Sequence, residues 1–154
     1  AHPIYAQKYS SARDYPAVAI SAIKEMYSQV GLLTIDAKGI AQKGLLIRML
    51  VLPNNLAGCK ENLRTLADEL GTELTLSLMG QYYPAGKAKN YKELARGISQ
   101  TEYFEVVDTA LELGFSHLFT QDISSSDIWT PDFSSSPDEI NPDSEFNPQA
   151  EQTQ

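Results

Sequence analysis

The sequence predicts an α/β fold in which parallel strands are joined by right-handed helical crossovers. Apolar runs of strand length alternate along the chain with longer segments whose apolar residues recur at helical spacing. The run 44–52 (GLLIRMLVL) is apolar on both parities apart from Arg48, a pattern typical of a strand that helices cover on both faces. Over residues 14–121 the predicted order is therefore helix, hairpin, strand, helix, strand, long loop, helix and strand.

The first predicted helix begins after Asp14, which is placed to cap it, and ends at Gly31. Pro16 is tolerated in the first turn of such a helix. The apolar residues recur at helical spacing and predict that one side packs on the rest of the domain: Ile20, Ile23, Tyr27 and Val30. Residues 1–13 show no sustained period, so we expect an irregular segment with at most one helical turn, at residues 4–8.

A small hairpin is predicted next. Residues 32–36 alternate like a short strand, and the turn residues 37–39 lead into a second short strand at 40–42. The apolar strand that follows is expected to end at Pro53, because proline cannot continue a central ladder.

The next helix is predicted from about Cys59 to Gly71, with one apolar face made of Leu63, Leu66, Ala67 and Leu70. The strand at 73–80 follows, and its two faces differ, with Leu74, Leu76 and Leu78 on one and Thr75, Ser77 and Met79 on the other. A parallel strand is usually apolar on both faces. The second face is therefore expected to look into a polar space.

The connection at residues 81–98 is long for a strand-to-helix loop, where about 2 to 6 residues is usual, and long loops are disproportionately functional. Ser99 and Glu102 are spaced as a capping box at the start of a third helix, which is expected to end at Gly114. Residues 117–121 (HLFTQ) predict a last short strand. The apolar stripe of the third helix is predicted to be Tyr103, Val107, Ala110 and Leu111.

The composition changes after residue 121, which divides the chain into a domain at 1–121 and a tail at 122–154. The tail holds seven serines, four prolines and eight acidic residues, and it has no lysine or arginine. Such a segment buries too little apolar area to offset its ordering entropy, so we expect it to be disordered. Its larger apolar residues allow two interpretations, a short clasp docked on the domain or a loose tail: Ile128, Trp129 and Phe133.

Charge and composition exclude several classes of function. The net charge of -8 comes from the tail, since the first 121 residues carry 12 acidic and 12 basic residues and no basic stripe for nucleic acid. No apolar run approaches about 18 residues and no signal peptide is present, which predicts a cytoplasmic, reducing location away from membranes. A single cysteine, Cys59, excludes an internal disulfide and a cysteine-built metal site within this chain.

Arg48 and Gln81 are the first candidates for a binding site. A cation in an apolar strand is costly unless an anion meets it, so Arg48 predicts either a structural salt bridge or a contact to a carboxylate or phosphate ligand. Gln81 continues the polar parity of its strand at the carboxyl end, where α/β sheets bind ligands, although a loop amide bonded to backbone is an equal alternative.

The remaining polar and aromatic candidates are weaker. Tyr82, Tyr83 and Pro84 can line a pocket or simply pack the long loop, and the loop lysines Lys87 and Lys89 are expected to be solvated. No catalytic residue is predicted, because the chain has no phosphate-binding glycine loop, no GxSxG elbow and no His-Asp-Ser set.

The histidines and the cysteine give no metal site either. His2 and His117 lack a His or Cys partner at metal-ligand spacing. Cys59 stands just inside a helix N-terminus, which can lower a thiol pKa, but a passive small residue is the favoured interpretation.

Four segments of the sequence resemble the C-terminal half of radical S-adenosylmethionine (SAM) proteins related to pyruvate formate-lyase activating enzyme. They are DYPAVAISAIKEMYSQVG, IAQKGLLIRMLVLPNNLAG, LTLSLMGQYYPAGKA and SQTEYFEVVDTALELGF, and the match covers roughly residues 8–121. The resemblance implies the C-terminal portion of a partial (β/α)6 TIM-like barrel, whose lumen holds a [4Fe-4S] cluster and SAM at the carboxyl ends of the strands. It implies that Arg48 reaches SAM and that Gln81 and Tyr82 border the adenine side of the pocket.

The chain departs from that family in one large respect. The family binds its cluster with three cysteines in a CxxxCxxC loop, and nothing in this sequence can replace them. The strands that would supply the other SAM contacts are absent as well. An intact relative cleaves SAM reductively to a 5'-deoxyadenosyl radical and often activates a glycyl-radical-type protein.

We therefore expect a fragment that is not catalytically competent alone and needs the missing N-terminal half of the barrel. The start at Ala1, without methionine, is expected to reflect truncation or processing. A non-catalytic half-barrel that binds a separate cysteine-bearing partner is the alternative, and a non-radical α/β binding domain is a third.

Overall fold

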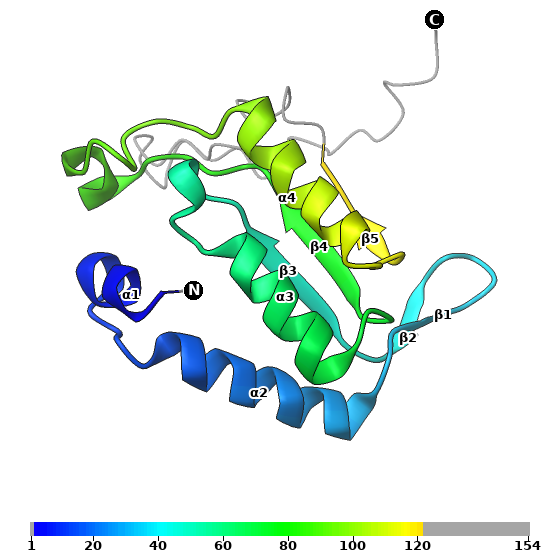
Figure 1. The fold of residues 1–154 in the computed structure, drawn as a ribbon. Coiled ribbons are helices and arrows are strands. Elements are labelled where there is room, and N and C mark those ends of the chain that lie inside the picture. Colours follow the sequence, from blue (N-terminus) through cyan, green and yellow to red (C-terminus); the bar gives the residue numbers. More distant parts are fainter. Residues whose placement is uncertain (1, 122–154) are drawn as a thin grey trace, which may run out of the picture.

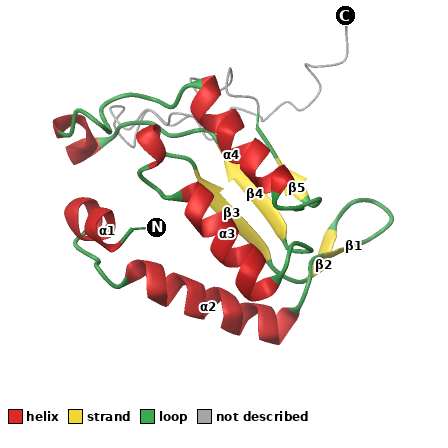
Figure 2. Cartoon of the chain, in the orientation of Figure 1, coloured by secondary structure: helices red, strands yellow, loops and turns green. Residues whose placement is uncertain are grey.

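The computed structural model describes residues 2–121, and the predicted tail with its clasp residues lies outside them. This part of the chain has an α/β fold (Figure 2). None of the helices between residues 2 and 121 is long and apolar enough to cross a bilayer. In order, the elements are α1 (Pro3–Ser10), α2 (Tyr15–Val30), β1 (Thr34–Ile35), β2 (Ala41–Lys43), β3 (Leu46–Leu50), the 3-10 turn η1 (Pro53–Asn55), α3 (Cys59–Leu70), β4 (Thr75–Met79), the 3-10 turn η2 (Gly86–Asn90), α4 (Gln100–Glu112) and β5 (Leu118–Phe119).

The strands form a parallel three-stranded sheet and a separate hairpin. The sheet order is β3-β4-β5, and both pairs of neighbours are parallel, as the sequence predicts. β1 and β2 pair antiparallel, which confirms the predicted hairpin. The described residues form an open sheet, and no closed barrel is found among them.

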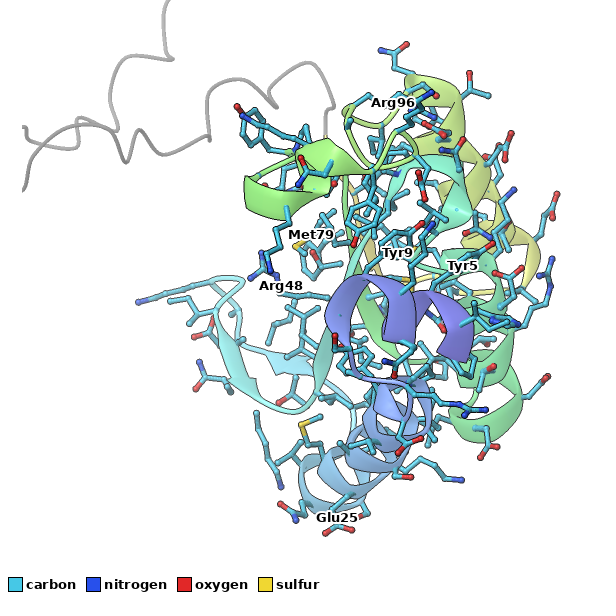
Figure 3. All side chains as sticks on the ribbon, turned by 90° about the vertical axis from the view of Figure 1, so that its left-hand side faces the viewer. Tyr5, Tyr9, Glu25, Arg48, Met79 and Arg96 are labelled. Atoms are coloured by element: carbon cyan, nitrogen blue, oxygen red, sulfur yellow. The ribbon has the colours of Figure 1, made fainter. Side chains whose placement is uncertain are left out.

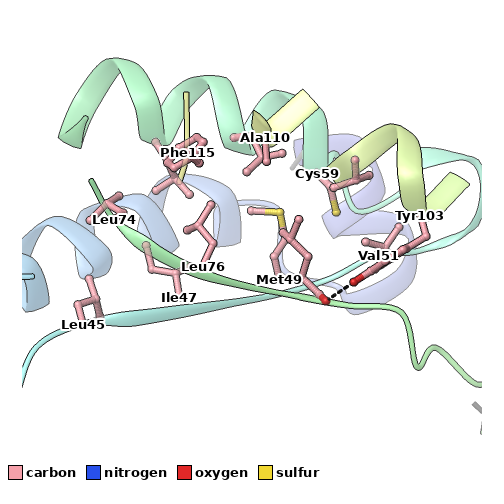
Figure 4. Close-up of a cluster of buried hydrophobic side chains, with 14 residues drawn as sticks. Leu45, Ile47, Met49, Val51, Cys59, Leu74, Leu76, Tyr103, Ala110 and Phe115 are labelled. Carbon is pink, nitrogen blue, oxygen red and sulfur yellow. Dashed lines mark hydrogen bonds between the residues drawn. The ribbon is translucent and has the colours of Figure 1, made fainter. Parts of the chain in front are cut away.

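Helices cover one face of the sheet. Figure 1 shows α3 and α4 in front of the strands, with α2 alongside α3. The leucines of β4 and the alternate residues of β3 point into this layer and meet Tyr103 and Phe115 (Figure 4). The fully or nearly buried core comprises Leu45, Ile47, Met49, Val51, Cys59, Leu63, Leu66, Leu74, Leu76, Leu78, Tyr103, Val106, Ala110 and Phe115.

The prediction that helices cover both faces of β3 is wrong. Leu46 is 40% exposed and Arg48 is exposed, whereas Ile47 and Met49 between them are buried. The leucines on the Arg48 parity resemble core residues in sequence, but among residues 2–121 no helix lies over that face. Composition alone cannot distinguish a strand with helices on both faces from a strand that has one apolar face without a covering helix.

Local signals at α2 and α4 produced the expected helices. Gly31 ends α2 with a positive φ of 69°, while Asp14 stands at the N-cap position without a side-chain capping bond. The capping box of α4 is confirmed, because Glu102 N donates to Ser99 Oγ (3.2 Å) and Ser99 N donates to Glu102 Oε2 (2.9 Å). The predicted apolar stripe of α4 is partly wrong, because Leu111 is 56% exposed, whereas Val106, which was not predicted, is buried.

Helix α1 (Pro3–Ser10) contains the single helical turn that the sequence allows at residues 4–8, but it is longer than expected for a segment predicted to be mostly irregular. Ile4 N donates to Nδ1 of His2 (3.3 Å), which caps the helix, and Pro3 occupies its first position. No residue of α1 is buried, so its sequence lacks the apolar repeat from which a packed helix is recognised.

Gly44 joins the hairpin to β3 through an unusually close backbone approach. Its φ is +112°, and a Cβ at this position would lie 2.1 Å from the carbonyl oxygen of Leu32. Leu32 forms an isolated parallel bridge with Leu45, the residue that follows. The start of β3 is therefore held against the chain that enters the hairpin, and only glycine fits at the crossing.

Candidate functional site

The side of the parallel sheet that faces away from the helices is here called the open sheet face. Within residues 2–121 it is formed by alternate strand residues: Leu46, Arg48, Leu50, the buried Thr75, Ser77, Met79 and Phe119. Arg48 stands opposite Ser77, and Ser77 stands opposite Phe119, so these three side chains form one row across the sheet. Figure 3 shows Arg48 and Met79 on the side toward which the β1–β2 hairpin projects. The face is thus largely apolar, with the hydroxyl side chains of Thr75 and Ser77 on its central strand and one cation, Arg48, on its edge strand.

Arg48 makes no hydrogen bond or ion pair with any of the described residues. The salt bridge that the sequence allows is therefore not formed within residues 2–121. Because Arg48 is exposed, its guanidinium keeps its hydration and needs no partner for stability. Its planar donors remain available to an external carboxylate or phosphate, the anions that they fit in bidentate fashion.

Gln81 lies at the carboxyl edge of the sheet beside Gln121, a residue that the sequence did not single out. Nε2 of Gln121 donates to Oε1 of Gln81 (3.2 Å), and Oε1 of Gln121 accepts from the backbone amide of Gly80 (3.0 Å). Gln121 lies two residues after Phe119, so the two side chains fall on the same side of an extended strand. This spacing is the sequence signal from which Gln121 could have been predicted. The Gln81 side chain is thus bonded to another side chain rather than to backbone, and its role as a ligand contact stays a prediction.

Tyr103 connects the ends of two strands behind this glutamine pair. Its hydroxyl donates to the carbonyl of Leu78 (2.8 Å) and accepts from the backbone amide of Gln121 (2.7 Å). Burial raises the pKa of the Tyr103 phenol, so the hydroxyl stays protonated and can serve both bonds. The carboxyl ends of β4 and β5 are thereby fixed relative to each other.

Tyr82 is half-buried, and its hydroxyl is used inside the protein. It donates to the carbonyl of Leu94 (2.9 Å), which joins the two ends of the long loop. Burial raises the pKa of this phenol too. The neighbouring Tyr83 is 53% exposed, and the ammonium of Lys89 lies 5.9 Å from its ring centroid.

The structure does not place Arg48 directly beside Gln81. Arg48 pairs in register with Ser77, which precedes Gln81 by four residues, a separation of about 13 Å at strand spacing. A ligand that contacts both residues must therefore be extended.

Glu102 ties together the loops that follow β3 and β4. Its carboxylate accepts two bonds from Arg96 (2.7 and 2.8 Å) and one from the backbone amide of Asn54 (2.7 Å). The hydrogen bonds from Arg96 are the main reason that the pKa of Glu102 lies well below its usual range. Asn54 has a positive φ of 57°, a conformation that asparagine tolerates in a tight turn.

A second polar cluster fastens α1 to the same loop. Glu93 accepts from the ammonium of Lys8 (2.5 Å) and from the hydroxyl of Tyr9 (2.6 Å). These two bonds, chiefly the one from Lys8, lower the pKa of Glu93 to about 2. The ring of Tyr9 packs edge-on against Tyr91, with centroids 5.1 Å apart.

A groove of about 490 Å3 lies between α1 and α2 on one side and β3 and α3 on the other. The successive residues 47–50 all line it, which means that the groove follows the outer edge of β3 rather than one face of the sheet. Its opposite side is aromatic and carries Tyr5, Tyr9 and Tyr15. β3 pairs with β4 on its inner edge only, so its outer edge is open to this groove.

Cys59 behaves as a passive core residue. It is fully buried, and its Sγ lies 3.6 Å from the carbonyl oxygen of Leu50. Burial raises the pKa of the thiol to about 11, although Cys59 lies in the first turn of α3. The favoured interpretation of Cys59 is supported.

We expect the Cys59 thiol to resist a disulfide reagent in the folded chain. The rise of the thiol pKa from 9.0 to about 11 lowers the thiolate fraction about 100-fold at neutral pH, and burial blocks access as well. The thiol is protonated in the folded state and ionised in the unfolded state between these values, so its contribution to stability is lost as pH rises from 9.0 to about 11. Thiol labelling with and without denaturant measures this, and fast labelling of the native chain would contradict it.

The described residues offer no group of three His, Cys, Asp or Glu side chains that could hold a metal ion. His2 caps α1, and His117 faces Glu73 at 3.8 Å on the surface. Cys59 points into the helix layer, away from the open sheet face.

Comparison with protein-family models, with curated proteins and with solved structures found no match to this chain. The likeness to radical SAM proteins therefore stays a prediction from the residues quoted for it.

Proposed function

We propose that this chain is part of a radical SAM enzyme related to pyruvate formate-lyase activating enzyme, and that it supplies one side of the SAM pocket. The observation that carries the proposal is Arg48, a cation without a partner among residues 2–121 on the uncovered face of a parallel sheet. No other charged residue lies in β3, β4 or β5. The proposed barrel would continue this sheet around the open face, which would become its lumen side.

The residues present fit part of SAM. Its α-carboxylate is the kind of planar anion that the guanidinium of Arg48 binds in bidentate fashion. Gln81 keeps its amide nitrogen available while its oxygen accepts from Gln121, so it can donate to a ring nitrogen of adenine. Tyr82 offers only its ring, because its hydroxyl is bonded to Leu94. These residues bind and orient the ligand, and we assign no proton transfer to them.

The residues do not fit the iron-sulfur cluster of the family. Such a cluster needs three cysteine thiolates here, and this sequence has only Cys59, which is buried, protonated and turned away from the open sheet face. The cluster ligands in this proposal therefore come from another part of the barrel, and no chemical step is assigned to the residues described.

The outer edge of β3 supports a function that depends on a further barrel segment. Beyond Leu45 this edge has no strand partner within residues 2–121, and the successive residues 47–50 line the groove beside it. An added strand would satisfy the backbone groups that an edge leaves unpaired. The same edge suits the second candidate function, a non-catalytic half-barrel that completes a separate cysteine-bearing chain.

Ligand-observed NMR on the full chain tests the SAM contact. We expect saturation transfer to SAM, with affinity about five-fold lower in Arg48→Ala, the loss typical of one exposed ion pair. Arg64→Ala is the matched control, because Arg64 is exposed on α3, on the helix-covered side. Equal SAM signals in both variants, or none in the unmodified chain, would reject the proposed pocket and leave the non-catalytic candidate.

A further inference from the structure

We propose that the acidic tail of this chain docks on the open sheet face, with its segment 127–133 as the occupant. This interaction surface shares Arg48 with the proposed SAM site but goes beyond it, because its occupant is a segment of this chain. The carboxylates of Asp127 and Asp132 would meet the guanidinium of Arg48, and the apolar side chains between and beside them would cover the leucines and Met79 of the face.

The place where the described chain ends supports this occupant. Residue 121 follows directly on β5, the strand that carries Phe119 on the open sheet face. β5 and β3 are two strand spacings apart, and Gln121 lies two residues past the row that contains Phe119 and Arg48. The distance across the face from Gln121 to Arg48 is therefore about 12 Å. Asp127 is six residues after Gln121, a length of chain that spans up to about 20 Å. The tail therefore reaches Arg48 without strain.

Charge and composition also match. The first 121 residues carry 12 acidic and 12 basic residues, whereas the tail carries eight acidic residues and no lysine or arginine. Arg48 is a cation on this face that no described residue neutralises. Three of the large apolar residues of the tail fall close to Asp127 and Asp132, namely Ile128, Trp129 and Phe133. The face itself exposes 40% of Leu46 and 56% of Phe119, which is apolar area that such side chains can cover.

Trp129 is the only tryptophan in the 154 residues, so its fluorescence reports on the tail alone. In the full chain at low ionic strength we expect blue-shifted emission and protection from acrylamide quenching. Arg48→Glu should lower the ratio of docked to free tail by up to about five-fold, the effect of an exposed ion pair, and shift the emission to the red. Arg64→Glu makes the same change of charge on the helix-covered side and should leave Trp129 unchanged.

A tail variant, Asp127→Asn with Asp132→Asn, repeats the test without any change in the folded domain. It should also expose Trp129, and failure to do so would overturn the proposal even if Arg48→Glu were misfolded. Emission typical of free tryptophan in the unmodified chain, or an equal response to Arg64→Glu, would overturn it as well. A blue shift that grows with protein concentration would assign the face to a second copy of the chain instead. None of these readouts uses SAM, so they test the docked tail whether or not SAM binds to Arg48.

Discussion

Replacing Gly44 with alanine is expected to destabilise the domain by about 3 kcal/mol, because overpacking adds to an unfavourable backbone angle. The added Cβ would lie 2.1 Å from the carbonyl oxygen of Leu32, which is a backbone atom and cannot rotate away, and φ at this position is +112°. Thermal unfolding followed by circular dichroism measures the effect, and a loss of this size lowers Tm by roughly 10 °C or more.

Gly39→Ala is the matched control for Gly44→Ala. Gly39 also has a positive φ, +79°, but a Cβ there would meet no heavy atom within 4 Å. Only the cost of the backbone angle remains, about 1 kcal/mol. Similar losses in the two variants would show that the close approach of Leu32 to Gly44 does not exist in solution.

Truncating Leu76 to alanine is expected to cost about 3 kcal/mol, the usual loss for a leucine deleted from a packed core. Leu76 lies on the central strand β4, and no part of it is exposed. The same change at Leu46 should cost less than about 1 kcal/mol, since the side chain is 40% exposed on the open sheet face. Guanidinium unfolding of the two variants measures both losses.

The contrast between Leu76 and Leu46 also reports on whether the sheet is covered. Equal losses in the isolated chain would contradict a sheet with helices on one face only. If the rest of a barrel covers the open sheet face, as the proposed function requires, the loss at Leu46 should increase in that larger assembly.

Much of the fold could be predicted because its signals are local. The capping box at Ser99 and Glu102, the glycines that end α2 and α3, and the leucine parity of β4 each depend on residues within a few positions. Such patterns specify where an element begins, where it ends and which side is buried.

The errors arise where long-range packing decides. Helix α1 has no buried residue, and it is held by a cap at His2 and by bonds to Glu93, more than 80 residues away. Leu111 has the same apolar character as Val106, but Leu111 is 56% exposed and Val106 is buried, because the elements packed around α4 decide which side of the helix is covered. No local pattern contains that information.

For the candidate site, the sequence identified Arg48 as unusual for a reason that the structure does not support. A buried cation was expected, whereas Arg48 is exposed on an uncovered face. Gln81 was predicted at the carboxyl edge and lies there, but its partner Gln121 comes from a different strand that pairs in parallel with β4. Side-chain pairs of this kind depend on sheet order, which spacing along one strand cannot give.

The hydroxyl of Tyr103 gives β5 a stability that its length cannot provide. β5 has only two residues paired with β4, and the bond from the Gln121 amide to Tyr103 fixes its end to α4. The strand therefore cannot open unless the helix loosens or that bond breaks. We therefore expect α4, β5 and the end of β4 to open together, so that movement of α4 reaches the glutamine pair at the sheet edge.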